Sequence, residues 1–558
     1  MLNQLKFFGA LTALTVVGAC ANEEPAAPAL FSDDLMASVT AAKTAPSAAE
    51  RIEADVAYLA DDAREGREAG TPGYDAAADY VAARLADLGL TPGADGSWFQ
   101  NVPLIASQAV VDDAALIITA PDGQATAFEN LGDFRLYTSI GADNFDIENA
   151  PAVFIGYGVH APEFGHDDLE GLDLNGKVVV YFSGAPDTFE SEQRAHFGNG
   201  KSKAWSERGA IGALAVRSEG DTNRNPWERL IQNPNSVSMT WLWPDGRAEQ
   251  SGPNIEGSGS VNPDISEALF AGAPKTFAEV RAEADAEGVA PAGFDLGVTI
   301  SMKGAATRTE KPSSNVVGVL AGSDPELRDE YVVLTAHLDG LGINQNLVDE
   351  GKDGINNGAL DNALGIATML EAASRLVENP PARSVIFLAV TAEEKGLLGA
   401  DYYAHFPTVP LESLAANVNL DMPLVLHSFT DVIAFGAERS SLGPIVAQAA
   451  EQAGVKLSPD PMPEQGIFTR SDHYRFVEKG VPAVFMIVGF ENGGAENFQT
   501  FITTNYHQPG DDITQAILYD DAARFADVNV EIAIAVANTP IRPSWNEGDF
   551  FGELFAGE

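Results

Sequence analysis

The second half of the chain contains five residues of the types that bind metal ions, each placed after an apolar run or in a loop before a helix. They are His337, Asp361, Glu394, Asp421 and His507. In an open α/β sheet, the side chains that follow the strands gather at one edge. Zinc accepts imidazole nitrogen and carboxylate oxygen, and a carboxylate can bridge two ions. This set of residues therefore fits a site for two metal ions.

Each part of this pattern is weak evidence alone. A histidine at a strand end, such as His337, is more often an ordinary core or surface residue, and adjacent glutamates such as Glu393 and Glu394 usually lie on a solvated face. The occurrence of all the parts in one order along the chain is what favours a metal site. That the side chains converge in space is an assumption, because a sequence contains order but not distance.

The elements that would position these residues alternate along the chain from Ser314 onward. Apolar runs bounded by turn residues predict strands, and apolar residues at helical spacing predict the helices between them. The predicted strands cover residues 331–336, 385–390, 415–420 and 483–488, and the predicted helices cover residues 363–377, 442–453 and 521–537. This alternation is typical of an α/β fold, with a mixed sheet covered by helices.

The rest of the chain has different patterns of apolar residues. Ile52, Val56 and Leu59 recur at helical spacing in a region that extends to Leu90, whereas short apolar runs between residues 151 and 290 predict a β-rich unit. A chain of 558 residues is long enough for two or three folded units. We therefore expect a first part of one domain at 48–150, an inserted unit at 151–290, the metal-binding part at 291–540 and a C-terminal tail at 541–558.

The charge balance excludes some partners. The chain has 81 acidic and 33 basic residues, which gives a net charge of -48. Such a charge argues against electrostatic binding to nucleic acid or to an anionic membrane surface.

The N-terminus predicts export. Lys6 precedes an apolar stretch that is too short to span a membrane, and Val17-Gly18-Ala19-Cys20 resembles a bacterial lipobox, in which the cysteine becomes the lipidated first residue. Cys20 is the only cysteine, so no disulfide forms within one chain. We expect a lipoprotein-type signal peptide at 1–19, a linker at 20–47, and an outer-membrane lipoprotein that faces the periplasm or the cell surface. An ordinary secretory peptide, and hence a secreted protein, is the alternative.

The motifs around the metal-binding residues resemble the M28 family of metallopeptidases, in particular the aminopeptidase Y and bacterial leucyl aminopeptidase group. The matching stretches are 337–339, 358–365, 391–400, 419–422, 470–473 and 506–507, and the stretch from Gly66-Arg67 to Leu90 is similar to the family's N-terminal helices. The resemblance implies a zinc-exopeptidase fold. Within the inserted unit, the stretches 156–159, 176–180 and 203–213 resemble a protease-associated (PA) domain, which is a non-catalytic lid or partner surface in related enzymes.

The resemblance also implies a role for each ligand. Asp361 would bridge two zinc ions, so that each chain holds two Zn²⁺. His337 and Asp421 would complete one site, and Glu394 and His507 the other. Glu393 would be the catalytic base, since a carboxylate that is not a ligand can take a proton from an activated water and pass it to the leaving amine.

Further residues are assigned supporting roles. Asp339 would accept the second ring N–H of His337 and so select its tautomer, although it can also be a bare loop charge. Tyr506 would hydrogen-bond the oxyanion, although a tyrosine beside a ligand can equally serve packing. The segment Arg470 to His473 would shape the substrate pocket or, with equal weight, form a helix start. The resemblance predicts a cis peptide bond between Asp361 and Asn362.

The function that follows is a zinc aminopeptidase acting on peptides. A carboxypeptidase, a glutaminyl cyclase with one zinc ion, or a non-catalytic binding protein on the same scaffold are alternatives. A serine hydrolase is disfavoured, because the chain has no Gly-x-Ser-x-Gly motif. Side-chain preference, recognition of the amino or the carboxyl end, and oligomeric state stay open, and manganese or cobalt can replace zinc at similar geometry.

Overall fold

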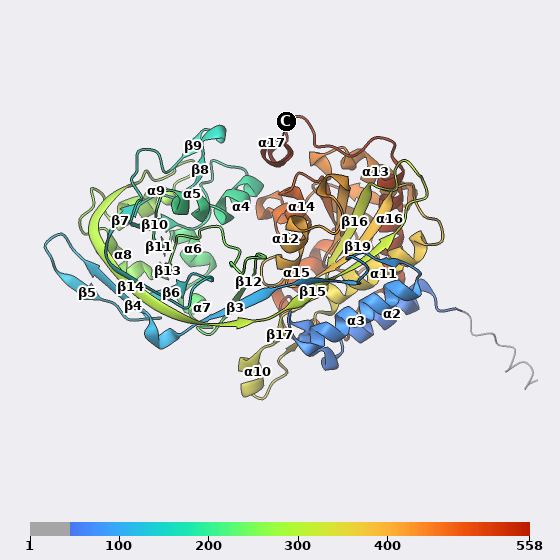
Figure 1. Cartoon of the computed structure of the whole chain (residues 1–558), viewed down its shortest axis with the longest axis horizontal. Helices are drawn as coiled ribbons and strands as arrows, with labels where there is room; N and C mark the ends of the chain where they lie inside the picture. The colour runs from blue at the N-terminus through green and yellow to red at the C-terminus, as the bar shows by residue number, and fades with distance from the viewer. Residues whose placement is uncertain (1–44, 558) are drawn as a thin grey trace, which may run out of the picture. The chain divides into compact units, whose positions relative to one another are not determined.

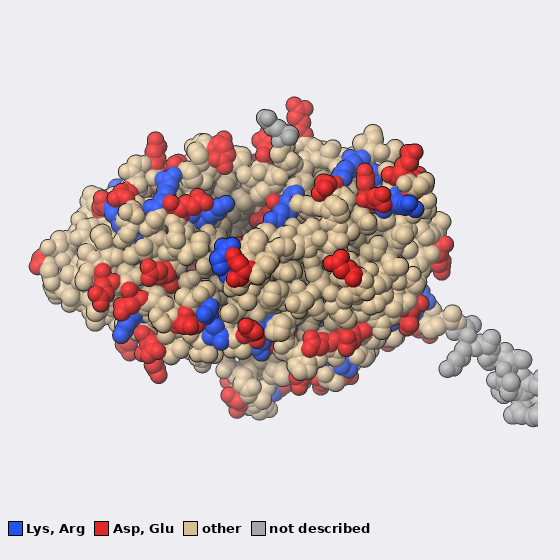
Figure 2. Space-filling model, in the orientation of Figure 1, with Lys and Arg blue, Asp and Glu red and all other residues tan. Residues whose placement is uncertain are grey.

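The computed structural model describes residues 45–557 of the chain (Figure 1). The predicted signal peptide, Cys20 and most of the linker expected at 20–47 lie outside the described residues. Within the described range, no helix combines the length and the apolar character that crossing a membrane requires. On the face shown in Figure 2, carboxylates are spread among fewer basic side chains, in keeping with the acidic composition.

One mixed sheet carries the predicted strands of the second half. Its strand order is β1-β15-β19-β16-β20-β23-β21-β22, and β2 pairs with β15. The central strands β19, β16, β20 and β23 run parallel. The bounds are β1 Thr91–Pro92, β2 Phe99–Val102, β15 Ser313–Leu320, β16 Tyr331–His337, β19 Ser384–Val390, β20 Leu414–Leu420, β21 Asp431–Phe435, β22 Lys456–Ser458 and β23 Ala483–Val488. The four predicted strands are confirmed, and their nearly continuous burial fits a parallel sheet covered on both faces.

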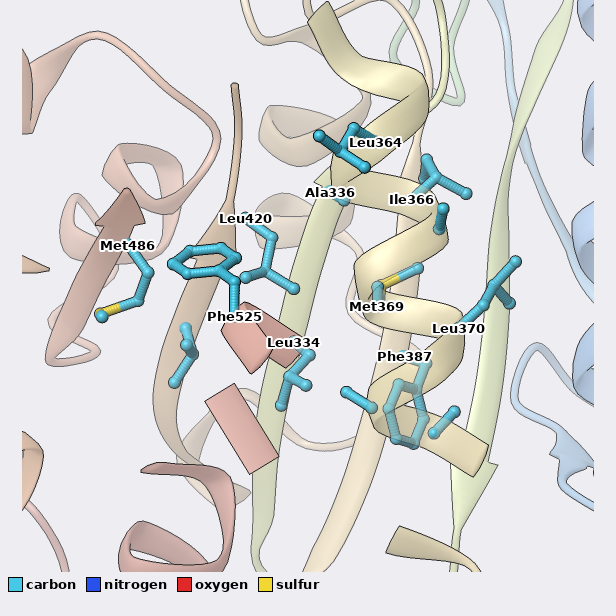
Figure 3. Close-up of a cluster of buried hydrophobic side chains, with 14 of the residues drawn as sticks. Leu334, Ala336, Leu364, Ile366, Met369, Leu370, Phe387, Leu420, Met486 and Phe525 are labelled. Atoms are coloured by element: carbon cyan, nitrogen blue, oxygen red, sulfur yellow. The ribbon is translucent and has the colours of Figure 1, made fainter. Parts of the chain in front are cut away.

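Helices cover both faces of this sheet. On one face, α2, α11 and α16 pack together, and Leu334 and Ala336 of β16 meet Leu364, Ile366 and Met369 of α11 (Figure 3). On the other face, α12 packs against α14. The bounds are α2 Ala48–Leu59, α3 Pro72–Asp87, α11 Leu364–Leu376, α12 Leu398–His405, α13 Leu442–Gln452, α14 His473–Val477, α15 Gly494–Thr504 and α16 Tyr519–Asn538. The predicted α/β class is confirmed.

A second, ten-stranded sheet has the order β12-β3-β14-β7-β10-β11-β13-β6, with β4 and β5 added beside β14. The bounds are β3 Leu104–Ala109, β4 Ala115–Thr119, β5 Ala125–Ala127, β6 Phe134–Thr138, β7 Asn144–Phe154, β10 Val178–Phe182, β11 Gly212–Val216, β12 Val237–Trp241, β13 Gly257–Val261 and β14 Phe294–Glu310. Six short helices accompany it: α4 Ser191–Asn199, α5 Ser202–Glu207, α6 Glu219–Arg224, α7 Trp227–Leu230, α8 Pro263–Leu269 and α9 Phe277–Ala284. We call residues 104–310 the insert.

The insert therefore extends beyond the boundaries expected at 151 and 290. The strand β3 pairs with β12 and with β14, and β4 also pairs with β14. These partners lie far apart in the sequence, so no local pattern indicates that residues 104–150 belong to the second sheet. The long strand β14 leads from this sheet directly to β15 of the first (Figure 1).

The C-terminal tail, expected at 541–558 without an assigned structure, contains the short helix α17, Phe550–Phe555. Asp549 caps this helix with its side chain. Phe551 is fully buried, and its ring lies 5.5 Å from that of Phe468. The tail is therefore packed onto the body of the molecule.

Candidate metal centre

Strand ends deliver the predicted ligands to one edge of the first sheet. His337 is the last residue of β16, Asp421 directly follows β20, and Glu393 and Glu394 follow β19. Because these three strands are parallel neighbours, their carboxyl ends meet at the same edge. Asp361 joins them from the turn before α11, and His507 from the loop after α15.

The five predicted ligands form two groups that share Asp361. One group is His337, Asp361 and Asp421, and the other is Asp361, Glu394 and His507. Within each group the ligand atoms lie within 4.8 Å of one another. The residue types in both groups, imidazole and carboxylate, match the ligands that zinc prefers.

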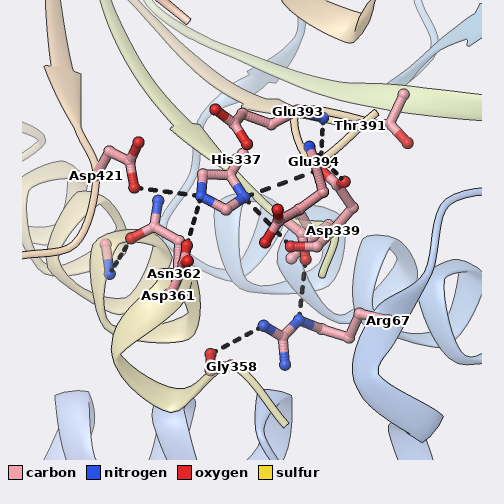
Figure 4. A network of polar contacts seen from close by, with 12 residues as sticks. Arg67, His337, Asp339, Gly358, Asp361, Asn362, Thr391, Glu393, Glu394 and Asp421 are labelled. Carbon is pink, nitrogen blue, oxygen red and sulfur yellow. Dashed lines mark hydrogen bonds and ion pairs between the residues drawn. The ribbon is translucent and has the colours of Figure 1, made fainter. Parts of the chain in front are cut away.

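The two carboxylate oxygens of Asp361 face different histidines. Oδ1 lies 3.1 Å from Nε2 of His337, and Oδ2 lies 3.4 Å from Nε2 of His507. Nε2 of His337 is also 3.2 Å from Oδ1 of Asp421 (Figure 4). Nε2 of His507 is 3.3 Å from Oε2 of Glu394. Asp361 thus presents one oxygen to each of the two groups.

Buried negative charge makes the site attractive to cations. Burial raises the pKa of Glu394 to about 8, with a further contribution from the charge of Asp361, and burial raises the pKa of Glu393 well above its ordinary value. Burial also acts to raise the pKa of Asp361, but hydrogen bonds from His337 and His507 outweigh it and lower that pKa. Several carboxylates therefore lie close together in a mostly buried site, and the repulsion between their charges favours the binding of divalent cations.

The turn that carries Asp361 is held from two sides. Its peptide bond to Asn362 is cis, as expected. The carboxylate of Asp511 accepts the backbone N–H groups of Leu360 and Asp361, each at 2.9 Å. Burial raises the pKa of Asp511 to about 7.

The guanidinium of Arg67 lies beneath the same turn and is buried. It donates to the carbonyl oxygens of Asn357, at 2.6 Å, and Gly358, at 3.0 Å. It also donates to the carbonyl oxygen of Leu338, at 2.9 Å, directly after the candidate ligand His337. Arg67 therefore ties together the backbones of two ligand-bearing segments. The motif resemblance covered Arg67 but assigned it no role.

Asp339 supports the site in a different way from the one expected. Its carboxylate accepts the backbone N–H groups of Glu393, at 3.0 Å, and Glu394, at 3.3 Å. Its Oδ1 lies 3.9 Å from Nδ1 of His337, whereas its backbone carbonyl oxygen lies 3.2 Å from that nitrogen. The ring of His337 is thus oriented by the main chain of Asp339, and the side chain positions the two glutamates.

Asp421 is oriented by a buried chain of hydrogen bonds. Its Oδ2 accepts a hydrogen bond from Ser471 at 2.6 Å, and Ser471 accepts one from Asn419 at 2.8 Å. Oδ1 of Asn419 accepts a hydrogen bond from Thr335 at 2.6 Å. The sequence allowed two interpretations of the segment from Arg470 to His473, a pocket wall and a helix start. A helix does start here, because α14 begins at His473. The hydroxyl of Ser471, however, donates to Asp421.

A cavity of about 300 Å³ opens onto the ligands. Glu393 and Tyr506 line it together with Asp361, Asp421 and His507. The ring of Tyr506 stacks on that of His507 at 3.7 Å between centroids, and burial raises the pKa of its hydroxyl, which keeps its proton. The rest of the wall is mostly apolar: Met422, Phe435, Met462, Ile467, Phe485, Ile487, Phe498 and Ile502, with Gln465, Arg470, Ser471 and Gln499.

Comparison with known proteins agrees with this geometry. Residues 315–533 match the model of peptidase family M28. The chain is 26% identical over 261 residues to a probable zinc metalloprotease of Pyrenophora tritici-repentis, covering 41% of this chain and 58% of that protein. It is 33% identical over 115 residues to the aminopeptidase YwaD of Bacillus subtilis, covering 20% of this chain and 22% of that protein. It thus spans less than two thirds of each relative.

Among solved structures, an aminopeptidase from Aneurinibacillus sp. strain AM-1 has a similar fold. The TM-score is 0.50 at 19% sequence identity, over 88% of this chain and 95% of that one. The match of fold extends across both sheets, while the match to the family model covers the sheet that carries the ligands. Residues 315–533, which include all five candidate ligands, therefore match peptidase family M28.

Proposed function

We propose that this protein is a zinc-dependent exopeptidase, and specifically an aminopeptidase that releases N-terminal residues from peptides by hydrolysis with two metal ions. One observation carries the proposal. Asp361 presents one oxygen to each of two ligand groups, and the carboxylate of Glu393 lines the same cavity without belonging to either group. The names of the relatives, a zinc metalloprotease and an aminopeptidase, support the metal and the activity.

His337, Asp361 and Asp421 would hold one ion, and Asp361, Glu394 and His507 the second. Bound zinc supplies Lewis acidity, which polarises a carbonyl group and acidifies water. Glu393 accepts a proton from the attacking water and delivers it to the leaving nitrogen, and its burial fits this role because a raised pKa lets the carboxylate hold the proton between the two steps. The hydroxyl of Tyr506 donates to the developing oxyanion.

Two complete ligand groups favour hydrolysis over cyclisation with one zinc ion, and a non-ligand glutamate in the cavity favours an enzyme over a binding protein. The test is cleavage of a peptide series with free and acetylated N-termini, with zinc and then with chelator. Cleavage that needs a free amine and stops with chelator would establish a zinc aminopeptidase. Cleavage that tolerates acetylation would move the assignment to a carboxypeptidase or an endopeptidase, and no cleavage would favour the cyclase or the binding protein.

The insert, which we propose to be a PA-like unit, would limit access to the cavity. Its helix α4 contacts residues 463–469, beside the cavity wall. Nδ1 of His196 in α4 lies 2.7 Å from the hydroxyl of Tyr474, and Glu192 of α4 forms an ion pair with Arg439. These contacts support a fixed position of the insert beside the substrate.

The finer localisation is also a proposal. The lipobox-like sequence before Cys20 supports export and a lipid anchor on the outer membrane. Substitution of Cys20 by Ser should release the protein from the membrane fraction of a bacterial host. An unchanged distribution between the fractions would contradict the anchor.

A further inference from the structure

One basic side chain lines the cavity wall at the edge of the metal ligands. Arg470 is the one Lys or Arg among the lining residues in the part of the chain that the structure describes. Its neighbours Thr469 and Ser471 are buried, whereas Arg470 is exposed. Arg470 is therefore accessible to solvent and, as a lining residue, to a ligand in the cavity.

Hydrogen bonds fix the backbone of Arg470 beside a residue that contacts a candidate metal ligand. Its N–H donates to the carbonyl oxygen of Ile467 at 3.0 Å. The next residue, Ser471, donates to Oδ2 of the ligand Asp421 at 2.6 Å. Arg470 is thus one residue, about 3.8 Å between Cα atoms, from a residue in contact with the metal site.

Arg470 has no ion-pair partner among residues 45–557, although the chain contains 81 acidic residues. Nearby arginines differ in this respect. Arg439 pairs with Glu192 and Asp549, and Arg475 pairs with Glu478. A planar guanidinium with five N–H donors matches the two oxygens of a carboxylate, so Arg470 is free to pair with a carboxylate supplied by a ligand.

The size of the cavity limits what that anion belongs to. About 300 Å³ is at the lower end of the volumes of small-molecule sites, and much of the wall is apolar and suited to a side chain. In a dipeptide, the terminal carboxylate lies about 3.5 Å, one residue, beyond the bond to be cleaved. A carboxylate at that distance can share the cavity with the reacting carbonyl group.

We propose that Arg470 binds a substrate carboxylate one or two residues beyond the scissile bond, so that the enzyme prefers short peptides with a free C-terminus. This inference rests on the proposed function, because it assumes that a peptide lies in the cavity. The same chemistry can come from an acidic side chain at that position, and the experiment separates the two sources.

The experiment measures binding without turnover. Zinc-loaded E393Q protein is titrated calorimetrically with Leu-Gly, Leu-Gly-amide and Leu-Asp-amide. Leu-Gly should bind about tenfold more tightly than Leu-Gly-amide, as expected for one partly solvated charge-assisted pair. Adding R470Q should abolish this difference and leave the affinity for Leu-Gly-amide unchanged, and R470K should retain part of it.

R247Q removes an exposed arginine of the insert that pairs with Asp245, and it should not change the ratio. A gain for Leu-Gly alone supports a subsite for the terminal carboxylate, and an equal gain for Leu-Asp-amide supports a subsite that also accepts side-chain carboxylates. Equal affinity for all three peptides, or an equal effect of R470Q on all three, would overturn the inference.

Turnover separates this inference from the proposed function. In protein with Glu393 intact, R470Q should raise KM for Leu-Gly about tenfold and leave kcat within about twofold. If the intact protein hydrolyses neither Leu-Gly nor Leu-Gly-amide, the proposed function fails. The calorimetric comparison still decides whether Arg470 binds the carboxylate.

Discussion

Adjacent glutamates in this site have different environments, in keeping with the different roles proposed for them. Glu394 lies 3.3 Å from Nε2 of His507 and belongs to a ligand group, whereas Glu393 belongs to neither group. Both backbones are held by the carboxylate of Asp339. The two glutamates therefore share a backbone anchor, and only the side chain of Glu394 belongs to a candidate ligand group.

Glu393→Gln tests the base. The variant should bind two zinc ions per chain and lose a factor of about 10²–10⁴ in kcat, because an amide cannot accept the proton. Elemental analysis of the purified protein checks the zinc, and steady-state kinetics checks kcat. Activity close to that of the unmodified protein would exclude Glu393 as the base.

Asp361→Ala tests the bridge. Each oxygen of Asp361 faces a different candidate ligand, so its loss should weaken the binding of both zinc ions. The variant should therefore retain fewer than one zinc ion per chain after dialysis. Asp421→Ala should weaken one ion only, because Asp421 belongs to one group. Two ions retained in Asp361→Ala would show that it does not bridge.

At the scale of helices and strands, the positions of the candidate ligands depend on contacts between turns and strand ends. Arg67, from the segment between α2 and α3, contacts the backbone after β16 and the turn before α11. Four carbonyl oxygens, including that of Leu59, accept its hydrogen bonds. The N-terminal helices therefore take part in shaping the metal site.

Arg67→Lys should weaken zinc binding by about 10–100-fold, because an ammonium group cannot reach the same set of carbonyl oxygens. Competition with a chelator measures the zinc affinity. Arg383→Lys is the matched control, since Arg383 is equally buried and bonds to Glu330 away from the site. Both variants should lose stability, and only Arg67→Lys should lose zinc affinity. An equal loss in both would mean that Arg67 acts through stability alone.

At the scale of the whole molecule, the two sheets and the C-terminal tail meet around His196. Its ring contacts the hydroxyl of Tyr474 and lies within an aromatic cluster that includes Phe550, Phe551 and Phe555. Burial lowers the pKa of His196 to about 4. The neutral ring is therefore part of the junction between the insert and the catalytic sheet.

This junction should weaken in acid. A histidine with a lowered folded pKa contributes stability that is present above its unfolded pKa of 6.5 and is lost as pH falls through about 4. The loss is about 3 kcal/mol at most. Urea unfolding of chelated protein at pH 7 and pH 4.5 should show a smaller acid-induced loss in His196→Gln than in the unmodified chain. An identical loss in both would contradict the assignment to His196.

The class of the fold was predictable from the sequence, and so were the candidate residues that the fold brings together. Apolar runs ending in His337 and before Asp421 identify buried parallel strands, and parallel strands deliver their last residues to one edge. Ligand chemistry is a property of residue type, so histidine and carboxylates in this order already imply a metal site. These features are local, so the types and the order of residues along the chain are enough to predict them.

Only the tertiary structure decided the features that depend on distant partners. The roles of Ser471, Arg67 and Asp511 come from hydrogen bonds to segments far along the chain, and residues 104–150 join the second sheet by long-range pairing. The contact of Asp339 with two backbone N–H groups, rather than with the ring of His337, depends on a side-chain direction. No residue's own type determines these contacts, because each is set by what the rest of the fold brings beside it.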